Sequence, residues 1–528
     1  MQEFIAKYQD QINGVLTGFD RLVFRGHLRA LSYPGGMNQY LACNRILLKD
    51  FGAHVDTVSR QLKEASLKAA HAAGRPVEYL RSAQTDKEKR ARAIAERDQV
   101  QEGLVGVLTS VEVCQSFEIY RNRETRRLEL QPRLRKCLFL YHYWMHPQLG
   151  FLNARIQTWF PFSIQICLNG REWLARQMDR RGLPYARQDN CFPWVEDWKP
   201  AQDLLERQRK TNWTPCLEGL ARQLNPIHEQ MFQRFRVHYY WSAYQSEWAT
   251  GVVFRDAAFL RRLVPRLLHH DLTTLGTRQV MRFLGRRVAL SGAIPKSFTG
   301  QVTSDLLERQ EGVRLKHAMN GNSVKLYDKA YTPLGSVLRA ETTIHNGADF
   351  RVYRPREGDP QGPKSWRVMR RGIADLYRRT EVSQAATERY LDALASVDDD
   401  TTLEELLAGL QKPRNWKGRR VRALRPFQDD QVLLETVSRG QFCLNGFRNR
   451  DLQARFFTTP ASDERERRRR SAGVTRRLRL LRAHSLIHKV PGTHRYQLSP
   501  SGRRAITAIL TALRATVRQL TPGAAMAA

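Results

Sequence analysis

Residues 462–496 decide the fold of the carboxyl-terminal end, and they read SDERERRRRSAGVTRRLRLLRAHSLIHKVPGTHRY. Successive residues of an α-helix are rotated by about 100°, so apolar residues gather on one face: Val474, Leu478 and Leu481. Basic residues project from the opposite face: Arg465, Arg469, Arg476 and Arg479. Asp463 and Glu466 are typical of a capping box at the helix start. The pattern predicts an amphipathic helix whose apolar face packs and whose arginine face remains available to a partner.

A short hairpin is predicted directly after this helix. Apolar and polar side chains alternate over residues 486–490 and again over residues 495–498, with a turn at residues 491–494 between them. Ser499 and Pro500 then fit the cap and the first turn of a closing helix. Two shorter helical segments precede the long helix. The order is therefore three helices, a two-stranded hairpin and a last helix.

This order resembles the winged-helix domains of bacterial transcription regulators of the MarR-like type, over residues 427–520. The resemblance implies that the arginine-bearing helix enters the major groove of DNA and that the hairpin contacts the backbone or the minor groove. It makes Lys489, His494 and Arg495 the expected contacts of the wing. The alternative is a basic helix that is merely solvated, but a solvated face commonly mixes both signs of charge.

The composition favours a polyanionic partner. The 528 residues include 87 Lys and Arg against 52 Asp and Glu, which gives a net charge of +35 and a pI of about 10.5. From Lys412 to the end, 26 basic and 7 acidic residues leave an excess of +19 in 117 residues. More than half of the excess charge therefore lies in under a quarter of the chain.

Other sequence features exclude several classes of protein. The seven cysteines stand singly, without the spacing of a zinc site or a disulfide framework. No apolar run is long enough to span a membrane, and no glycine-rich nucleotide-binding loop is present. We therefore expect a cytoplasmic, nucleoid-associated protein with no membrane partner. The sequence leaves the oligomeric state open.

The pattern upstream predicts a multidomain α+β protein, in which a mixed α/β N-terminal and central core is followed by a helical connector and a C-terminal winged helix-turn-helix domain. Strand and helix patterns alternate along the first two thirds of the chain. The expected parts are a mixed region over 1–103, an α+β core over 104–364, a helical connector over 365–411, a basic linker over 412–426 and the winged-helix domain over 427–520.

The core carries one segment that suggests chemistry. Residues 323–329 read SVKLYDK, and residues 338–341 read LRAE. The pair resembles the Tyr-Asp-Lys turn and Arg-x-Glu strand of rolling-circle replication initiators of plasmids and phages, although their His-apolar-His metal motif is missing. The resemblance implies that Tyr327, or a tyrosine of residues 239–244, attacks phosphorus. Lys329 would offset charge, and Glu341 would orient a metal, Mg²⁺ or Mn²⁺, or a water molecule.

Asp20 is a second candidate metal ligand, because it lies in an early strand pattern, where ribonuclease-H-like nucleases keep a carboxylate. Together with Glu341, Asp328 or Asp256 it would form a metal site. The alternative is an ion pair between Asp20 and a nearby arginine. His142 and His146 stand four residues apart, but a strand pattern surrounds them, so they are expected to be core or edge residues.

These observations favour a DNA-processing protein of the mobile-element or plasmid replication type. The winged helix would locate a DNA site, and the core would nick a DNA strand with the help of a metal. A non-catalytic DNA-binding transcription regulator is one alternative. A structured-RNA-binding component of a ribonucleoprotein is the other, because RNA also satisfies the positive charge.

Overall fold

The structure is a computed structural model of the whole chain. It describes residues 1–286, 301–309, 312–356, 358–359, 361–396, 402–438, 442, 446–457, 459, 461–490 and 493–513. Helices and strands both contribute large parts of the chain, which confirms the expected α+β class. Among the described residues, no helix combines the length and the apolar character needed to cross a membrane.

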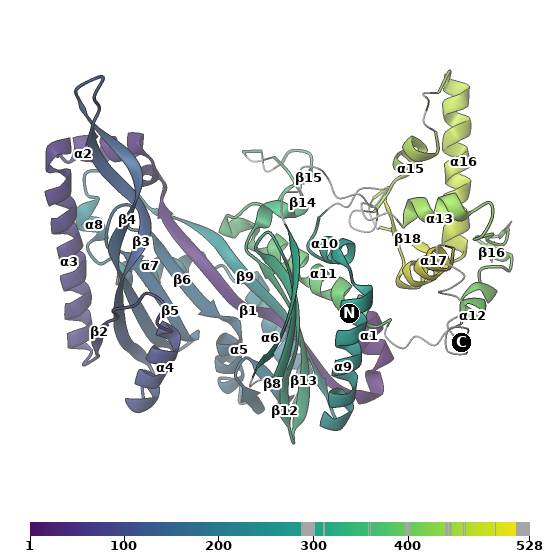
Figure 1. Cartoon of the computed structure of the whole chain (residues 1–528), viewed down its shortest axis with the longest axis horizontal. Helices are drawn as coiled ribbons and strands as arrows, with labels where there is room; N and C mark the ends of the chain where they lie inside the picture. The colour runs from purple at the N-terminus through teal and green to yellow at the C-terminus, as the bar shows by residue number, and fades with distance from the viewer. Residues whose placement is uncertain are drawn as a thin grey trace, which may run out of the picture.

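One large sheet organises the chain (Figure 1). Its order is β10-β11-β12-β13-β9-β1-β6-β5-β4-β3-β2. All the neighbouring strands pair antiparallel except β2 and β3. Its strands are β1 (Ile12–Leu28), β2 (Val77–Tyr79), β3 (Gly103–Arg121), β4 (Leu128–His146), β5 (Gly150–Gln157), β6 (Ile164–Asn169), β9 (Tyr239–Phe254), β10 (Val302–Arg309), β11 (Gly312–Met319), β12 (Asn322–Thr332) and β13 (Gly335–Ile344).

The two central strands, β1 and β9, run side by side through both halves of the sheet (Figure 1). On one side of this pair lie β2 to β6, and on the other lie β10 to β13. The apolar side chains of β1 serve both halves, since Phe24 packs in one large core and Ile12 in another. The middle of β1 is therefore the place where the two halves meet.

The helices of the first half are α2 (Pro34–Cys43), α3 (Phe51–Ala72), α4 (Lys87–Arg97), α7 (Thr214–Leu224) and α8 (His228–Met231). Those around the second half are α1 (Gln2–Lys7), α5 (Gly170–Asp179), α6 (Trp198–Lys210), α9 (Ala257–Thr274), α10 (Thr277–Phe283) and α11 (Leu376–Leu394). Hairpins β7 (Tyr185–Gln188) with β8 (Cys191–Val195) and β14 (Arg351–Arg354) with β15 (Ser365–Val368) complete this part. Helices α9 and α11 cover one face of the sheet, while α5, α6 and β8 lie against the other (Figure 1).

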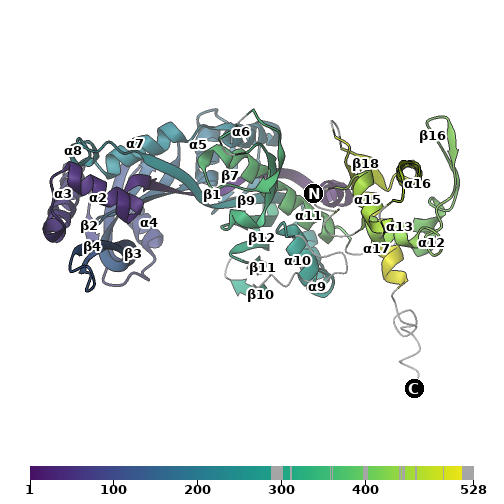
Figure 2. The same ribbon diagram turned by 90° about the horizontal axis from the view of Figure 1, so that it is seen from above.

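The remaining elements form a separate terminal module, defined here as the described part of residues 402–513. It contains α12 (Leu403–Ala408), β16 (Arg414–Trp416), β17 (Arg419–Val421), α13 (Gln431–Val437), α15 (Asn449–Phe456), α16 (Glu464–Ala483), β18 (Ile487–Lys489), β19 (Tyr496–Leu498) and α17 (Pro500–Ala512). Its members share one apolar core. The module lies at the opposite end of the molecule from α2 and α3 (Figures 1 and 2).

Several elements differ from the sequence expectations. Within the expected connector, the pattern of residues 365–394 predicts one helix, but the helix begins only at Leu376, because Trp366 and Val368 lie in β15 and Gly372 precedes it in extended backbone. The tyrosine-rich residues 239–244 are the start of the long strand β9. The stretch 412–426, expected to be a linker, holds the β16–β17 hairpin, and its Val421 packs in the core of the module.

Candidate functional site

Three carboxylates meet at the centre of the large sheet. Asp20 on β1, Glu247 on β9 and Glu341 on β13 each place an oxygen within 4.8 Å of the other two. The strand order explains the meeting, because β1, β9 and β13 are neighbours. We call these three residues the acidic cluster. The sequence predicted Asp20 and Glu341 as partners, but it did not predict Glu247.

A bulge at Asp20 brings its carboxylate to the face of the other two. Phe19 pairs with Trp248 and Arg21 with Glu247, so Asp20 is an extra residue on β1. Such a bulge redirects a side chain relative to a regular strand. Thr343 pairs with Glu247, and Glu341 lies two residues from Thr343 on the same face.

Cations already balance part of this negative charge. Arg339 Nη2 lies 2.7 Å from Asp20 Oδ2 and 3.4 Å from Glu341 Oε2, and Arg339 is buried. Lys325 Nζ lies 2.5 Å from Glu341 Oε1. Arg171 Nε lies 4.0 Å from Asp20 Oδ1. Asp20 therefore forms the ion pair with arginine that the sequence offered as the alternative, and it also belongs to the acidic cluster.

One buried oxygen of the cluster has no hydrogen-bond donor, and one of its carboxylates has no ion pair. The buried Asp20 Oδ1 accepts no hydrogen bond, and no ion pair in the described part of the chain includes Glu247. Glu247 accepts a hydrogen bond from Gln245 Nε2 at 2.9 Å. Burial raises the pKa of Glu247, and the charge of Glu341 raises it further. A carboxylate with a raised pKa beside a second carboxylate would gain from an added cation.

The pKa of Asp20 shifts the other way. Burial raises it, but the charges of Arg339 and Arg171 outweigh burial, so the pKa of Asp20 lies below its usual value. Asp20 is therefore ionised at neutral pH. Burial lowers the pKa of Arg171 to about 10, and the neighbouring Arg339 contributes to the shift. The site thus combines an ionised carboxylate with one that holds its proton more tightly.

Tyr327 and Lys329, predicted on the Tyr-Asp-Lys segment, lie on β12 beside the cluster. Tyr327 pairs directly with Arg339, so both side chains lie on the face of the acidic cluster. Burial raises the pKa of Tyr327 to about 12, with a further contribution from Glu341. Lys329 Nζ lies 3.8 Å from Asp189 Oδ2. Lys329 is therefore paired with a loop carboxylate outside the cluster.

One side of the cluster is closed. Asn190 Nδ2 donates to Asp20 Oδ2 at 3.1 Å, and Asn190 immediately precedes β8. The cavity that remains among Arg171, Asn190, Cys191 and Arg339 has about 10 Å³, which is about the room of one water molecule. The half-buried Gln245 and Glu247 lie on the other side of the cluster, along β9.

The other acids and the histidine pair have separate roles. Asp256 caps α9 by accepting from the backbone N–H groups of Ala258 and Phe259. Asp328 accepts from the backbone of Val313 and from Tyr331, outside the cluster. His142 is buried on β4 and lies 2.6 Å from Ser66 Oγ. His146 Nδ1 accepts from the backbone of Gln148 and Leu149. The expectation that both histidines lie on a strand is confirmed.

The long amphipathic helix in the terminal module is α16. Val474, Leu478 and Leu481 pack in the core of the module, as the periodicity predicted. Arg465, Arg469 and Arg476 are exposed, and Arg479 is half-buried. Asp463 accepts from the backbone of Glu466, but the Glu466 side chain bonds Ser462, so only half of the expected capping box forms.

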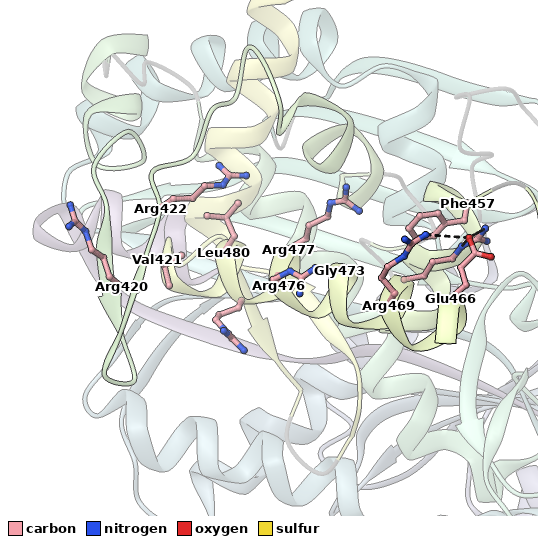
Figure 3. A pocket seen from close by; sticks show the side chains of 12 residues that line it. Arg420, Val421, Arg422, Phe457, Glu466, Arg469, Gly473, Arg476, Arg477 and Leu480 are labelled. Carbon is pink, nitrogen blue, oxygen red and sulfur yellow. Dashed lines mark hydrogen bonds and ion pairs between the residues drawn. The ribbon is translucent and has the colours of Figure 1, made fainter. Parts of the chain in front are cut away.

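A groove of about 580 Å³ runs along α16. Arginines line it from two elements, as Figure 3 shows for α16 and the end of the β16–β17 hairpin. Its lining residues are Arg420, Val421, Arg422, Phe457, Glu466, Arg469, Arg470, Gly473, Arg476, Arg477, Arg479 and Leu480. The arginines of the hairpin were not predicted as part of a site, because the sequence pattern had been interpreted as a linker. Phe457, which follows α15, was not predicted either.

The predicted contacts of the wing have different surroundings. Lys489 and His494 are exposed, whereas Arg495 is half-buried and lies over the ring of Trp366 on β15, 5.7 Å from its centroid. Burial lowers the pKa of Arg495. Pro491 and Gly492, in the turn of the hairpin, lie outside the described residues.

A comparison of the chain with family models, curated proteins and solved structures finds no match. Two places in the structure bear on function, the acidic cluster and the arginine-lined groove.

Proposed function

We propose that this protein binds duplex DNA through its terminal module and cuts one DNA strand at the acidic cluster with a divalent cation, Mg²⁺ or Mn²⁺. The observation that carries the proposal is the meeting of Asp20, Glu247 and Glu341 on three neighbouring strands. Glu247 adds the strongest support, because it is half-buried beside Glu341 and forms no ion pair among the described residues, although the charges of Lys325 and Arg21 act on it.

The donor set fits such an ion. Mg²⁺ and Mn²⁺ prefer oxygen ligands, and all three side chains offer carboxylate oxygens. Within this set, the buried Asp20 Oδ1 accepts no hydrogen bond and is therefore available as a metal ligand. When bound, the ion would neutralise charge on a phosphate group and lower the pKa of a coordinated water molecule. Asp20, Glu247 and Glu341 would hold it.

The surrounding residues would position these ligands. Arg339 joins Asp20 to Glu341, and Lys325 holds the second oxygen of Glu341. A pKa of about 12 leaves on the order of one Tyr327 in 10⁵ as phenolate at pH 7. The proposal therefore assigns the attack on phosphorus to water and leaves Tyr327 protonated, able to donate a hydrogen bond.

The arrangement of the terminal module supports duplex binding. Helices α13, α15 and α16 are followed by β18 and β19, and Phe447 forms a single antiparallel bridge to Tyr496 of β19. This is the order expected of a winged helix. The exposed arginines of α16 form the surface that we propose enters the major groove, with Lys489 and His494 near the backbone.

The activity test uses labelled single-stranded and duplex DNA, with Mg²⁺, with Mn²⁺ and with a chelator. The wild-type protein should produce nicks only with metal. Glu247→Gln and Glu341→Gln should abolish them, whereas Glu381→Gln, at an exposed position on α11, should cut normally. Tyr327→Phe should still cut and should form no covalent adduct. The proposal fails if no condition produces nicks, or if cutting persists in both cluster variants.

The binding test uses the same duplex and follows affinity against salt concentration. Arg476→Ala or Arg479→Ala should lose about 1 to 3 kcal/mol of preference for the bound sequence if each contacts a base. Arg123→Ala, an exposed arginine of the β3–β4 turn, is the matched control. Equal affinity for all variants, or tighter binding of structured RNA than of duplex DNA at the same salt concentration, would overturn duplex recognition by α16.

The cations around the cluster favour a second candidate, a DNA-binding protein without catalysis. Arg339, Lys325 and Arg171 lie against two of the three carboxylates, as in a buried ion network that only joins strands. In that case duplex binding should persist without nicks, and Mg²⁺ should leave the unfolding temperature unchanged.

A further inference from the structure

A cluster of arginines and aromatic rings lies beside the acidic cluster on the central strands. It comprises Arg25 and Arg29 from β1 and the turn after it, Tyr240 and Tyr244 from β9, His345 after β13, and Arg371. We call it the arginine–tyrosine surface. Arg371 is tied to β9 by its backbone carbonyl, which accepts from Ala243 N at 2.8 Å.

The rings of this surface hold the guanidinium groups in place. The guanidinium carbon of Arg25 lies 3.3 Å from the ring centroid of Tyr244, and that of Arg29 lies 3.4 Å from the centroid of Tyr240. The His345 ring meets Tyr244 edge to face, with centroids 4.4 Å apart. Contacts of this kind fix the direction of a guanidinium group without neutralising its charge.

The positive charge of the surface is not balanced locally. No ion pair in the described part of the chain includes Arg25, Arg29 or Arg371. Burial lowers the pKa of Arg25, and Arg155 and Arg371 lower it further by their like charge. Burial also lowers the pKa of His345, again with contributions from arginines. Like charges held together in this way favour an anionic ligand.

The surface and the acidic cluster share one face of the sheet. Arg21 pairs with Glu247, and Arg25 lies four residues further along β1 on the same face. On β9, Tyr244 is three residues from Glu247, which is about 10 Å at about 3.3 Å per residue. Helices α5 and α6 and strand β8 pack on this same face beside Leu16 and Val253, and the arginine–tyrosine surface lies in the opposite direction along β1 and β9.

We propose that the arginine–tyrosine surface binds a single-stranded nucleic acid and leads it to the acidic cluster. Arg25, Arg29 and Arg371 would contact consecutive phosphates. Tyr240, which is 38% exposed, would present its ring to a base. This inference rests on the proposed function for the role of the cluster, and it adds the strandedness of the substrate and the residues that grip it.

Single strands fit this surface better than a duplex does. Arg25 and Tyr244 are half-buried on the sheet, so their ligand must lie close to the strands. An aromatic ring beside a phosphate-binding cation is typical of single-strand binding, because an unpaired base exposes its face for stacking. In a duplex the bases stack on one another, and the rings would find no partner.

The test measures binding of a labelled 12-mer of thymidine and of a duplex of the same length by fluorescence anisotropy, without metal. Arg25→Gln and Arg29→Gln should each weaken single-strand binding about tenfold and lower the slope of log affinity against log salt by about 0.7. Duplex binding through the terminal module should change by less than about twofold. Arg351→Gln, an exposed arginine of β14, should behave as wild type.

Two features of the design separate the failure of this inference from the failure of the proposed function. Arg29 is exposed, so Arg29→Gln tests the surface even if Arg25→Gln does not fold. Glu247→Gln should retain full single-strand binding. If Arg29→Gln weakens single-strand binding but neither wild type nor any variant cuts DNA, single-strand binding by this surface is supported and the nuclease proposal fails. If the two arginine variants bind single strands as well as wild type does, the inference is overturned even where cutting is observed.

Discussion

Replacement of Arg339 by methionine tests how the acidic cluster is balanced. Arg339 is buried and lies 2.7 Å from Asp20 and 3.4 Å from Glu341, so Arg339→Met removes the cation that both carboxylates share. Removing one partner of a buried ion pair costs about 3 to 5 kcal/mol, because the other charge stays buried. Lys325 remains beside Glu341, and Arg171 lies 4.0 Å from Asp20, so Asp20 loses the most.

The expected shift in unfolding temperature follows from the size of the sheet domain. An unfolding entropy of about 2.1 cal/mol/K per residue over roughly 390 residues gives about 0.8 kcal/mol/K, so the temperature should fall by roughly 4 to 6 °C. Acid should reduce the difference. In the wild type the pKa of Asp20 is depressed, so its contribution to stability is present above its ordinary value of 3.8 and is lost as the pH falls through the folded value.

Thermal unfolding followed by circular dichroism at pH 7.5 and near pH 3 provides the measurement. Arg351→Met, at an exposed position, is the control and should change stability by less than about 0.5 kcal/mol. Mg²⁺ should raise the unfolding temperature of Arg339→Met more than that of wild type, because a cation replaces the lost guanidinium. A variant as stable as wild type at pH 7.5, or a deficit of the same size at both pH values, would refute the reasoning.

Four further changes have definite expected results. Glu247→Gln should raise stability at pH 7.5, and the gain should vanish below about pH 4.5 in urea unfolding at several pH values, because a raised carboxyl pKa costs stability only above the unfolded value of 4.5. Gly502→Ala should destabilise the terminal module by about 1 to 3 kcal/mol in denaturant titrations, since its Cβ would lie 2.1 Å from Leu486 O. Gly473→Ala, 4.0 Å from its nearest neighbour, should instead stabilise α16 by about 0.5 to 1 kcal/mol. Leu481→Ala should cost about 2 to 5 kcal/mol in the same titrations, as its side chain is fully buried, and a loss below 1 kcal/mol would contradict the packing described for α16.

The terminal module was the part of the fold that the sequence predicted best. Its long helix, hairpin and closing helix follow from local periodicity and capping residues, which operate over a few turns of chain. The β16–β17 hairpin was missed because its basic residues hide the two apolar positions, Trp416 and Val421, that attach it to the module. Charge density alone does not distinguish a linker from a solvated hairpin.

The large sheet was predicted only as separate strands. The patterns of residues 104–108 and 117–120 each predict a short strand, whereas β3 is continuous from Gly103 to Arg121. Its polar residues Glu112 and Gln115 lie on exposed or half-buried positions, so they interrupt the apolar pattern without ending the strand. Strand order was not predicted, because pairing between distant strands leaves no local signal.

The acidic cluster was half predicted for the same reason. Asp20 and Glu341 were predicted because each is a carboxylate within a strand pattern. Glu247 was not predicted, because residues 239–244 were interpreted as a tyrosine cluster and not as the start of a strand. In the structure, mostly alternating buried and half-buried residues from Trp241 to Glu247 belong to β9. That Arg339 would join two of the carboxylates required knowledge of the register between β13, β9 and β1.

The pairing of β1 with β9 has a consequence for synthesis of the chain. Phe19 leaves the ribosome 229 residues before its partner Trp248. At about 5 to 20 residues per second, the first long strand waits roughly 10 to 50 s for its neighbour. During this time its apolar side chains have no native partner on that edge. The central pair of the sheet can therefore form only after β9 has been translated.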